Sequence, residues 1–248
     1  MSPELAEIVE QAYELFAPYQ VSKPLDVCMS CCVTREEEHQ LATLQLREIP
    51  HALLYAWNRS AITQQPDQNE LKYFLPRILD FIARYQWLPA EPARTFKRFP
   101  NEPDGQWAAA ELELLHRFGY AFFRDSVNSQ NAIRHANPLD IVEMFMPTGI
   151  DVCKLFSTWQ QSHTTSAVGA LAELATSRQF KAVKPAYNVA FSSTELNERV
   201  AGWLCNEGVL RELAGKLEHV ILQDDSLDDR AYAELNASYE TIQLLLPG

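Results

Sequence analysis

The sequence predicts an all-α protein, an irregular multi-helix bundle of roughly ten helices with little or no β structure. Apolar residues recur at three- and four-residue spacing through most of the 248 residues, which is the period of amphipathic helices. Only 8 residues are glycine, whereas sandwich, barrel and Rossmann-type folds usually need more glycine for tight turns and close backbone approach. No internal repeat or sustained heptad is present, so the pattern favours an irregular bundle.

The first helix is predicted to begin at Ser2, with Pro3 in its first turn, because a hydroxyl cap and an early proline are typical of helix starts. Its apolar side follows at helical spacing up to Phe16, and Pro18 ends the helix. Residues 19–33 are expected to form a loop or an extended segment.

Three further helices are predicted before residue 88. Thr34 and Glu37 form a capping box that starts the second helix, whose apolar residues continue to Leu46. Pro50 can occupy the first turn of the third helix, because a proline there loses no helical hydrogen bond. Asp67 is the predicted cap of the fourth helix.

Prolines also predict the domain organisation. Pro76 lies inside the fourth helix, where it predicts a kink or a break. Residues 89–103 hold four prolines and no hydrophobic period, which is typical of a linker. The chain is therefore expected to be a single helical domain, 1–248, or two subdomains, 1–88 and 104–248, joined by this Pro-rich linker.

The remaining helices are predicted after residue 103. Asp104 is expected to cap the longest of them, over about residues 105–127. Asn137 begins another, and Ser192 with Glu195 forms a second capping box. Other helices are predicted near residues 152–159 and 164–177, after Gly208 and after residue 229.

The composition predicts an acidic protein with a basic partner. The chain carries 21 basic and 33 acidic residues, a formal net charge of −12 at pH 7. Such a surface repels phosphate backbones and anionic membranes, which disfavours nucleic acid and membranes as partners and favours a basic protein. The first residues show no signal peptide, and no apolar run approaches the ~18 residues of a membrane span. A cytoplasmic location is therefore expected, where the five cysteines stay reduced.

Three of the cysteines cluster as Cys28-x-x-Cys31-Cys32, and His39 follows them. Thiolates at this spacing can bind one zinc ion, and a histidine seven residues further on can reach it. A closed structural site needs four ligands, which a distant cysteine could complete. Alternatively, the thiols are buried like small apolar side chains, or Cys28 and Cys31 form a redox pair. The sequence requires no cofactor, and zinc is the candidate metal.

Two Glu-x-x-His pairs offer a di-iron alternative. They are Glu36 with His39 and Glu113 with His116. Residues i and i+3 share a helix face, and ferritin-like bundles place two such pairs with two further glutamates around their metals. The candidates for the two further ligands are Glu143 and Glu173.

Motifs for nucleophilic catalysis and phosphate binding are absent. The sequence contains neither G-x-S-x-G nor the two common glycine-rich phosphate loops, so binding is favoured over catalysis. The run from Arg94 to Phe99 interleaves basic and aromatic residues. We interpret it as a segment held by its two phenylalanines or paired with the protein's own acids, rather than as a nucleic-acid groove.

Two acidic runs are the candidates for partner contacts, because complementary charge raises association rates and selects the partner. The candidate partner-binding residues are Glu36, Glu37, Glu38, Asp224, Asp225, Asp228 and Asp229.

One stretch of the chain resembles a known group. It combines P-L-D-V-C-x-x-C-C from Pro24, L-R-E-I-P at 46–50, L-L-Y at 53–55 and N-x-S-A at 58–61, with a weaker continuation at 71–77. This stretch of sequence resembles uncharacterised bacterial helical proteins encoded beside polymorphic, Rhs-type toxins. The resemblance implies a cytoplasmic immunity protein that neutralises a cognate toxin by occluding its basic active-site surface. The alternatives are the metal-binding protein or enzyme described above, and a non-catalytic helical adaptor.

Overall fold

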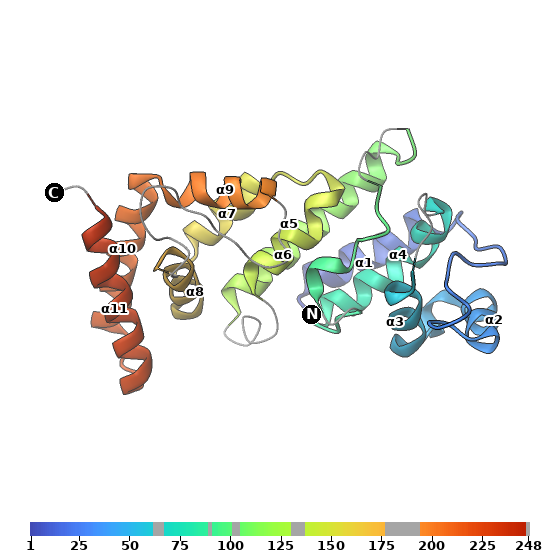
Figure 1. The fold of residues 1–248 in the computed structure, drawn as a ribbon, viewed down its shortest axis with the longest axis horizontal. Coiled ribbons are helices and arrows are strands. Elements are labelled where there is room, and N and C mark those ends of the chain that lie inside the picture. The colour runs from blue at the N-terminus through green and yellow to red at the C-terminus, as the bar shows by residue number, and fades with distance from the viewer. Residues whose placement is uncertain (62–66, 89–90, 101–104, 130–136, 177–193, 247–248) are drawn as a thin grey trace. The chain divides into compact units, whose positions relative to one another are not determined.

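The computed structural model describes residues 1–61, 67–88, 91–100, 105–129, 137–176 and 194–246 (Figure 1). These residues form eleven α-helices and three short 3-10 helices, and they include no β-strand, which confirms the all-α prediction. The α-helices are α1 (Pro3–Leu15), α2 (Arg35–Thr43), α3 (His51–Arg59), α4 (Gln68–Ala83), α5 (Ala109–Asn128), α6 (Pro138–Phe145), α7 (Val152–Gln161), α8 (Thr165–Thr176), α9 (Thr194–Leu204), α10 (Glu207–Gln223) and α11 (Asp229–Leu245).

The chain divides into two compact units. The first comprises Met1–Phe123 with Ala136–Asp151, and the second comprises Arg124–His135 with Val152–Gly248. The predicted linker at 89–103 does not separate these units, because its described part, residues 91–100, lies inside the first. Phe96 and Phe99 are buried there, so the interpretation of this segment as one held by its two phenylalanines is confirmed.

Four predicted helix starts are confirmed by side-chain caps, among them Asp67 at α4 and Asn137 at α6, whose side chains accept bonds from the N–H groups of Asn69 and Leu139. The Ser2 hydroxyl accepts a hydrogen bond from the first turn of α1. Thr34 and Glu37 make the reciprocal bonds of the capping box at the start of α2. The second helix is shorter than predicted, because Leu44 adopts an extended conformation, and Leu46 begins a 3-10 turn, η1 (Leu46–Glu48), instead.

Two further predictions, a break at Pro76 and a helix start near residue 105, differ from the structure. α4 runs unbroken through Pro76, so the predicted break is wrong, whereas the alternative of a kink stays a prediction. Pro76 is buried among apolar neighbours whose burial offsets the missing backbone donor. α5 begins at Ala109 rather than near residue 105, because Gly105 has a φ of +79°, outside the right-handed helical range. The predicted caps Asp104 and Ser192 lie outside the described residues.

α4 is the central helix of the first unit. Thirteen of its 16 residues are buried, and α1 lies along it (Figure 1). From α3, the Trp57 ring centroid lies 4.8 Å from that of Phe74, and Phe96 lies 5.4 Å from Phe145 of α6. The buried polar and charged residues of α4 are Gln68, Glu70, Lys72 and Asp80. This helix therefore carries a buried polar network as well as the apolar core.

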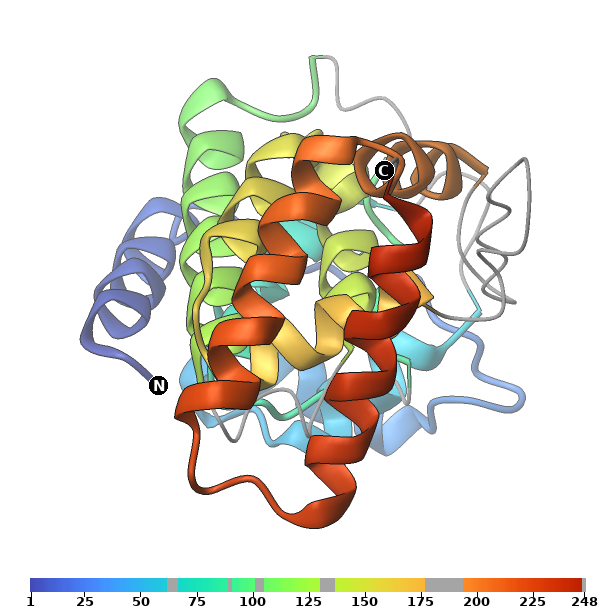
Figure 2. The ribbon, with the colours of Figure 1, turned by 90° about the vertical axis from the view of Figure 1, so that its left-hand side faces the viewer.

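The second unit is organised by a helical hairpin. α10 and α11 lie side by side, and α8 contacts both (Figure 2). Phe156 of α7 stacks on Trp203 of α9 with ring centroids 4.5 Å apart. The acidic run that was singled out in the sequence forms the connection between α10 and α11 and the first turn of α11.

Candidate functional site

The three clustered cysteines lie together in the loop between α1 and α2. Cys28 Sγ lies 3.3 Å from Cys31 Sγ, and Cys31 Sγ lies 3.2 Å from Cys32 Sγ. All three sulfurs fall within 4.8 Å of one another, so this group could hold a metal ion. Cys31 is exposed and the other two thiols are half-buried, which leaves the group open to solvent on one side.

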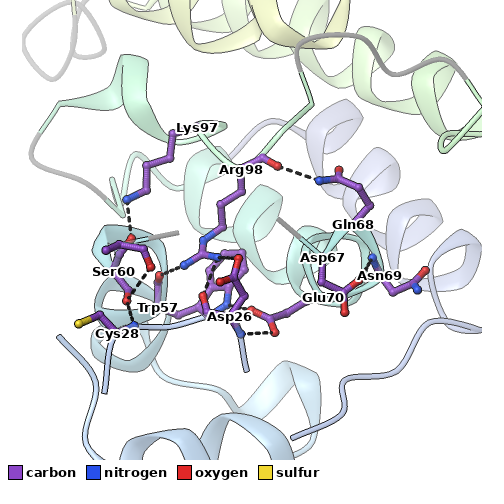
Figure 3. Close-up of polar contacts among 11 residues, drawn as sticks. Asp26, Cys28, Trp57, Ser60, Asp67, Gln68, Asn69, Glu70, Lys97 and Arg98 are labelled. Atoms are coloured by element: carbon purple, nitrogen blue, oxygen red, sulfur yellow. Dashed lines mark hydrogen bonds and ion pairs between the residues drawn. The ribbon is translucent and has the colours of Figure 1, made fainter. Parts of the chain in front are cut away.

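Four hydrogen bonds hold the loop that carries the thiols. The backbone N–H groups of residues 25, 26 and 28 donate to Glu38 Oε1, Glu70 Oε2 and Ser60 Oγ, at 2.9, 3.0 and 2.6 Å. Arg98 Nη1 donates to the carbonyl oxygen of Asp26 at 2.9 Å (Figure 3). These acceptors and donors come from α2, α4, the end of α3 and the segment 91–100, so four distant parts of the sequence position one loop.

A buried network continues beneath the loop. Arg98 is only 1% exposed, donates to the carbonyl oxygen of Trp57 at 2.9 Å and lies over the Trp57 ring. The indole N–H of Trp57 in turn donates to Glu70. Burial raises the pKa of Glu70 above its ordinary value, although the bonds from Trp57 and Asp26 oppose that shift. The ion pair of Arg98 with Asp26 confirms that the basic run pairs with the protein's own acids.

The thiols differ in acidity because they hydrogen-bond to one another. Bonds from Ser30 and then from Cys31 lower the pKa of Cys28 to about 6. The bonds of Cys31 to Cys32 and then to Cys28 raise the pKa of Cys31 to about 11. The bond from Cys31 also lowers the pKa of Cys32. Thiolates are the form that binds metal and attacks electrophiles, so Cys28 is the most reactive member of the group at neutral pH.

His39 is not part of this group. Its exposed Nδ1 atom lies 2.8 Å from Lys23 Nζ, and it falls outside the set of ligand atoms within 4.8 Å of one another. The structure therefore assembles three of the four residues predicted as metal ligands. The other cysteines, Cys153 on α7 and Cys205 just after α9, are exposed and belong to the second unit.

The two Glu-x-x-His pairs do not form a di-iron site. Among the described residues, which include all six candidate ligands, the three thiols are the only group of three or more potential ligands within reach of one ion. Glu36, Glu113 and Glu173 are exposed, and His116 Nε2 lies 2.7 Å from the carbonyl oxygen of Thr148. The glutamates thus face solvent instead of a bundle interior, which sequence spacing alone could not reveal.

The carboxylates of the first acidic run, Glu36 to Glu38, make hydrogen bonds within the protein. Glu37 completes the capping box of α2, and Glu38 accepts the bond from Leu25 that anchors the cysteine loop. Glu36 is exposed and accepts a bond from Gln40 one turn later. One of its three carboxylates therefore remains fully exposed.

The second acidic run, Asp224 to Asp229, has more exposed carboxylates than the first. Asp224 accepts bonds from Thr165 and Ser226, and Asp228 is the N-cap of α11. Asp225, Asp228 and Asp229 are exposed. This connection therefore keeps more of its negative charge on the surface than the first run does.

A pocket of about 380 Å³ adjoins the thiol group, and sequence reasoning missed it. We call it the basic pocket. Its charged lining residues are Arg59, Arg94, Lys97 and Glu91. The lining is completed by Cys32, Tyr55 and Asn58. The basic run at 94–98 was a signal for it, but the approach of Arg59 to that run depends on the fold.

The basic pocket is partly pre-arranged. The Arg59 guanidinium lies over the Tyr55 ring, 5.7 Å from its centroid. Lys97 Nζ donates to the carbonyl oxygen of Ser60 at 2.9 Å (Figure 3). Burial, and then the neighbouring arginines Arg98 and Arg94, lower the pKa of Lys97 to about 8. Cations are therefore crowded on this side of the thiol group.

Comparison with protein-family models, with curated proteins and with solved structures finds no match to this chain. The resemblance to immunity-like proteins stays a prediction. In the described part of the chain, no helix combines the length and hydrophobicity that crossing a bilayer needs.

Proposed function

We propose that this chain is a metal-binding helical protein in which Cys28, Cys31 and Cys32 hold one zinc ion. The observation that carries the proposal is the convergence of three sulfurs on a loop that four separate segments hold in place. Anchoring by hydrogen bonds reduces the conformational entropy that a metal would otherwise have to offset on binding.

The geometry suits a thiophilic ion with one open position. Three thiolates at the usual zinc–sulfur distance of about 2.3 Å lie about 3.8 Å apart in a tetrahedral site. The two observed sulfur–sulfur contacts, 3.2 and 3.3 Å, are within about 0.6 Å of that value, so small side-chain adjustments would bring the thiols into position. Zinc with three protein ligands keeps its fourth position for water or another ligand. The role of such a site depends on the ligand that occupies this fourth position.

Zinc titration of the reduced, chelator-treated protein tests the proposal. We expect one zinc per chain, and we expect Cys28→Ser or Cys32→Ser to weaken binding more than about 100-fold, beyond the range typical for outer-shell residues. Cys205→Ser is the matched control, because it removes an exposed thiol outside the group. Binding that survives in the triple Cys28/Cys31/Cys32→Ser variant would refute the assignment.

A second candidate function rests on charge. We propose, as the alternative, an immunity-type protein whose acidic C-terminal helices cover a basic toxin surface. Residues 194–246 contain eleven acidic and four basic side chains, and Asp225, Asp228 and Asp229 are exposed between α10 and α11. An excess of exposed carboxylates of this kind supports fast association with a basic protein.

Charge neutralisation tests this second candidate. Replacing Asp224, Asp225, Asp228 and Asp229 with asparagine removes four charges but keeps residues that can cap a helix. We expect association with a cognate basic toxin domain to slow by about tenfold or more at low salt, and by less at high salt.

The matched control neutralises as many charges in the first unit, by changing Glu4, Glu7, Glu14 and Glu113 to glutamine. Equal slowing in the two variants would show that net charge, rather than this connection, governs association. Co-expression separates an immunity protein from an adaptor, since only the former restores growth to cells that produce the toxin.

A further inference from the structure

We infer that the basic pocket binds the carboxylate or phosphate group of a small anionic molecule and places that molecule beside Cys32. This goes beyond zinc binding and does not depend on it, because the pocket is formed by side chains that are not metal ligands, Cys32 excepted.

The first step of the argument is the local charge. Arg59, Arg94 and Lys97 contribute three cations to the pocket lining, and Glu91 contributes one anion, 3.7 Å from Arg94. Net positive charge therefore remains in the lining, even when the Cys32 thiol is ionised, within a chain whose net charge is −12. A cavity that concentrates positive charge on a strongly acidic protein favours an anion over a neutral or cationic ligand.

The second step is the kind of hydrogen-bonding group. Arginine side chains present a planar fork that matches carboxylate and phosphate oxygens. Arg59 is held over the Tyr55 ring, and Arg94 is 61% exposed with only a long contact to Glu91, so both have donors to offer. Carboxylates and phosphates therefore fit this pocket better than halides, because a halide has no second oxygen to accept the other of two parallel hydrogen bonds from one guanidinium.

The third step is an unused acceptor. Asn58 is fully buried and lines the pocket; its Nδ2 atom donates to the carbonyl oxygen of Thr95 at 2.8 Å, but its Oδ1 atom has no hydrogen-bond partner. Buried polar atoms without partners are uncommon and call for an explanation. A ligand hydroxyl or amine would satisfy this acceptor, which indicates a molecule larger than a simple inorganic ion.

The fourth step is size and position. A volume of about 380 Å³ lies in the range of small-molecule sites. Cys32 belongs both to this lining and to the thiol group. A ligand anchored by the arginines thus reaches the thiol group at Cys32, where it can meet a thiolate or the open position of a bound metal.

Paired alkylation rates test the inference on metal-free, reduced protein. Iodoacetate and iodoacetamide react alike: the thiolate sulfur forms a bond to carbon as the carbon–iodine bond breaks and iodide leaves. Only iodoacetate carries a carboxylate. We expect the iodoacetate-to-iodoacetamide rate ratio, measured by mass spectrometry, to be at least about tenfold higher at Cys32 than at the exposed Cys153 and Cys205. Inorganic phosphate or acetate should abolish the preference, and chloride should not.

The variant Arg59→Gln/Arg94→Gln should remove the preference at Cys32. Arg199→Gln/Arg211→Gln removes the same charge from helices of the second unit and should preserve it. Both variants change exposed side chains, so both are expected to fold. An equal rate ratio at all three cysteines, or an equal loss in both variants, would overturn the inference. A chain that shows the preference but no zinc binding would refute the zinc proposal alone.

Discussion

Replacing Lys72 with methionine is expected to lower the free energy of unfolding by about 3–5 kcal/mol. Lys72 Nζ lies 2.7 Å from Glu111 Oε2, and the two side chains are 5% and 4% exposed. The same ammonium group donates to Tyr19 Oη at 3.1 Å and to the carbonyl oxygen of Gln106 at 2.6 Å. Its removal leaves a buried carboxylate without a cation and a carbonyl without a donor.

The dependence of this loss on pH follows from Glu111. Burial alone would raise its pKa, but bonds from Lys72 and Tyr19 hold that pKa below the ordinary value of 4.5. A depressed pKa contributes stability above the unfolded value, and this contribution is lost as the pH falls through the folded value. Without Lys72, the carboxylate is easier to protonate, so the deficit of the variant should be largest at neutral pH and should shrink below about pH 4.5.

Denaturant unfolding at pH 7 and pH 4 measures both effects. Arg230→Met is the control, because its ion pair with Glu234 is exposed and should contribute nothing measurable. The double variant Lys72→Met/Glu111→Leu should recover much of the loss, since it removes both charges together. A loss below about 1 kcal/mol in the single variant would show that the pair is more hydrated than its burial indicates.

Local patterns explain why the helices could be predicted. Ser2 and the Thr34–Glu37 capping box satisfy backbone groups within a few residues, so their spacing in the sequence is enough to place a helix start. Local patterns fail where tertiary burial decides. Pro76 costs a hydrogen bond, yet α4 continues because its apolar face is buried along its whole length.

The candidate site was only partly predictable for the same reason. The proximity of Cys28, Cys31 and Cys32 follows from their spacing, but His39 contacts Lys23 and lies outside the thiol group, which spacing alone could not reveal. The anchors of the loop come from residues that are far away in the sequence; Arg98 and Asp26 are separated by 72 positions. No periodicity in a single sequence records such a contact, and the basic pocket depends on the same long-range packing.

Replacing Arg98 with methionine is expected to affect stability and metal binding together. The variant leaves the carbonyl oxygen of Asp26 without its Arg98 donor and leaves that of Trp57 with only the bond from the Ser60 N–H. It also removes a cation whose charge lowers the pKa of the buried Glu70, so we expect a loss of about 3–5 kcal/mol. It also releases one anchor of the cysteine loop. Zinc affinity should therefore fall by about 10–100-fold, as it does when residues that orient metal ligands are removed.

A destabilised protein could lose zinc merely because part of it is unfolded, so the affinity must be measured where each variant is folded. Lys216→Met is the control: Lys216 is 10% exposed, pairs with Glu212 in the second unit and makes none of the hydrogen bonds that hold the cysteine loop. We expect it to lower stability and leave zinc affinity unchanged. Arg98→Lys should retain part of both properties, since it keeps the charge but cannot reach both carbonyls. If zinc affinity followed stability equally in the Arg98 and Lys216 variants, Arg98 would be a structural residue only; if it fell in the Arg98 variants alone, the buried network would be the feature that arranges the thiols for metal.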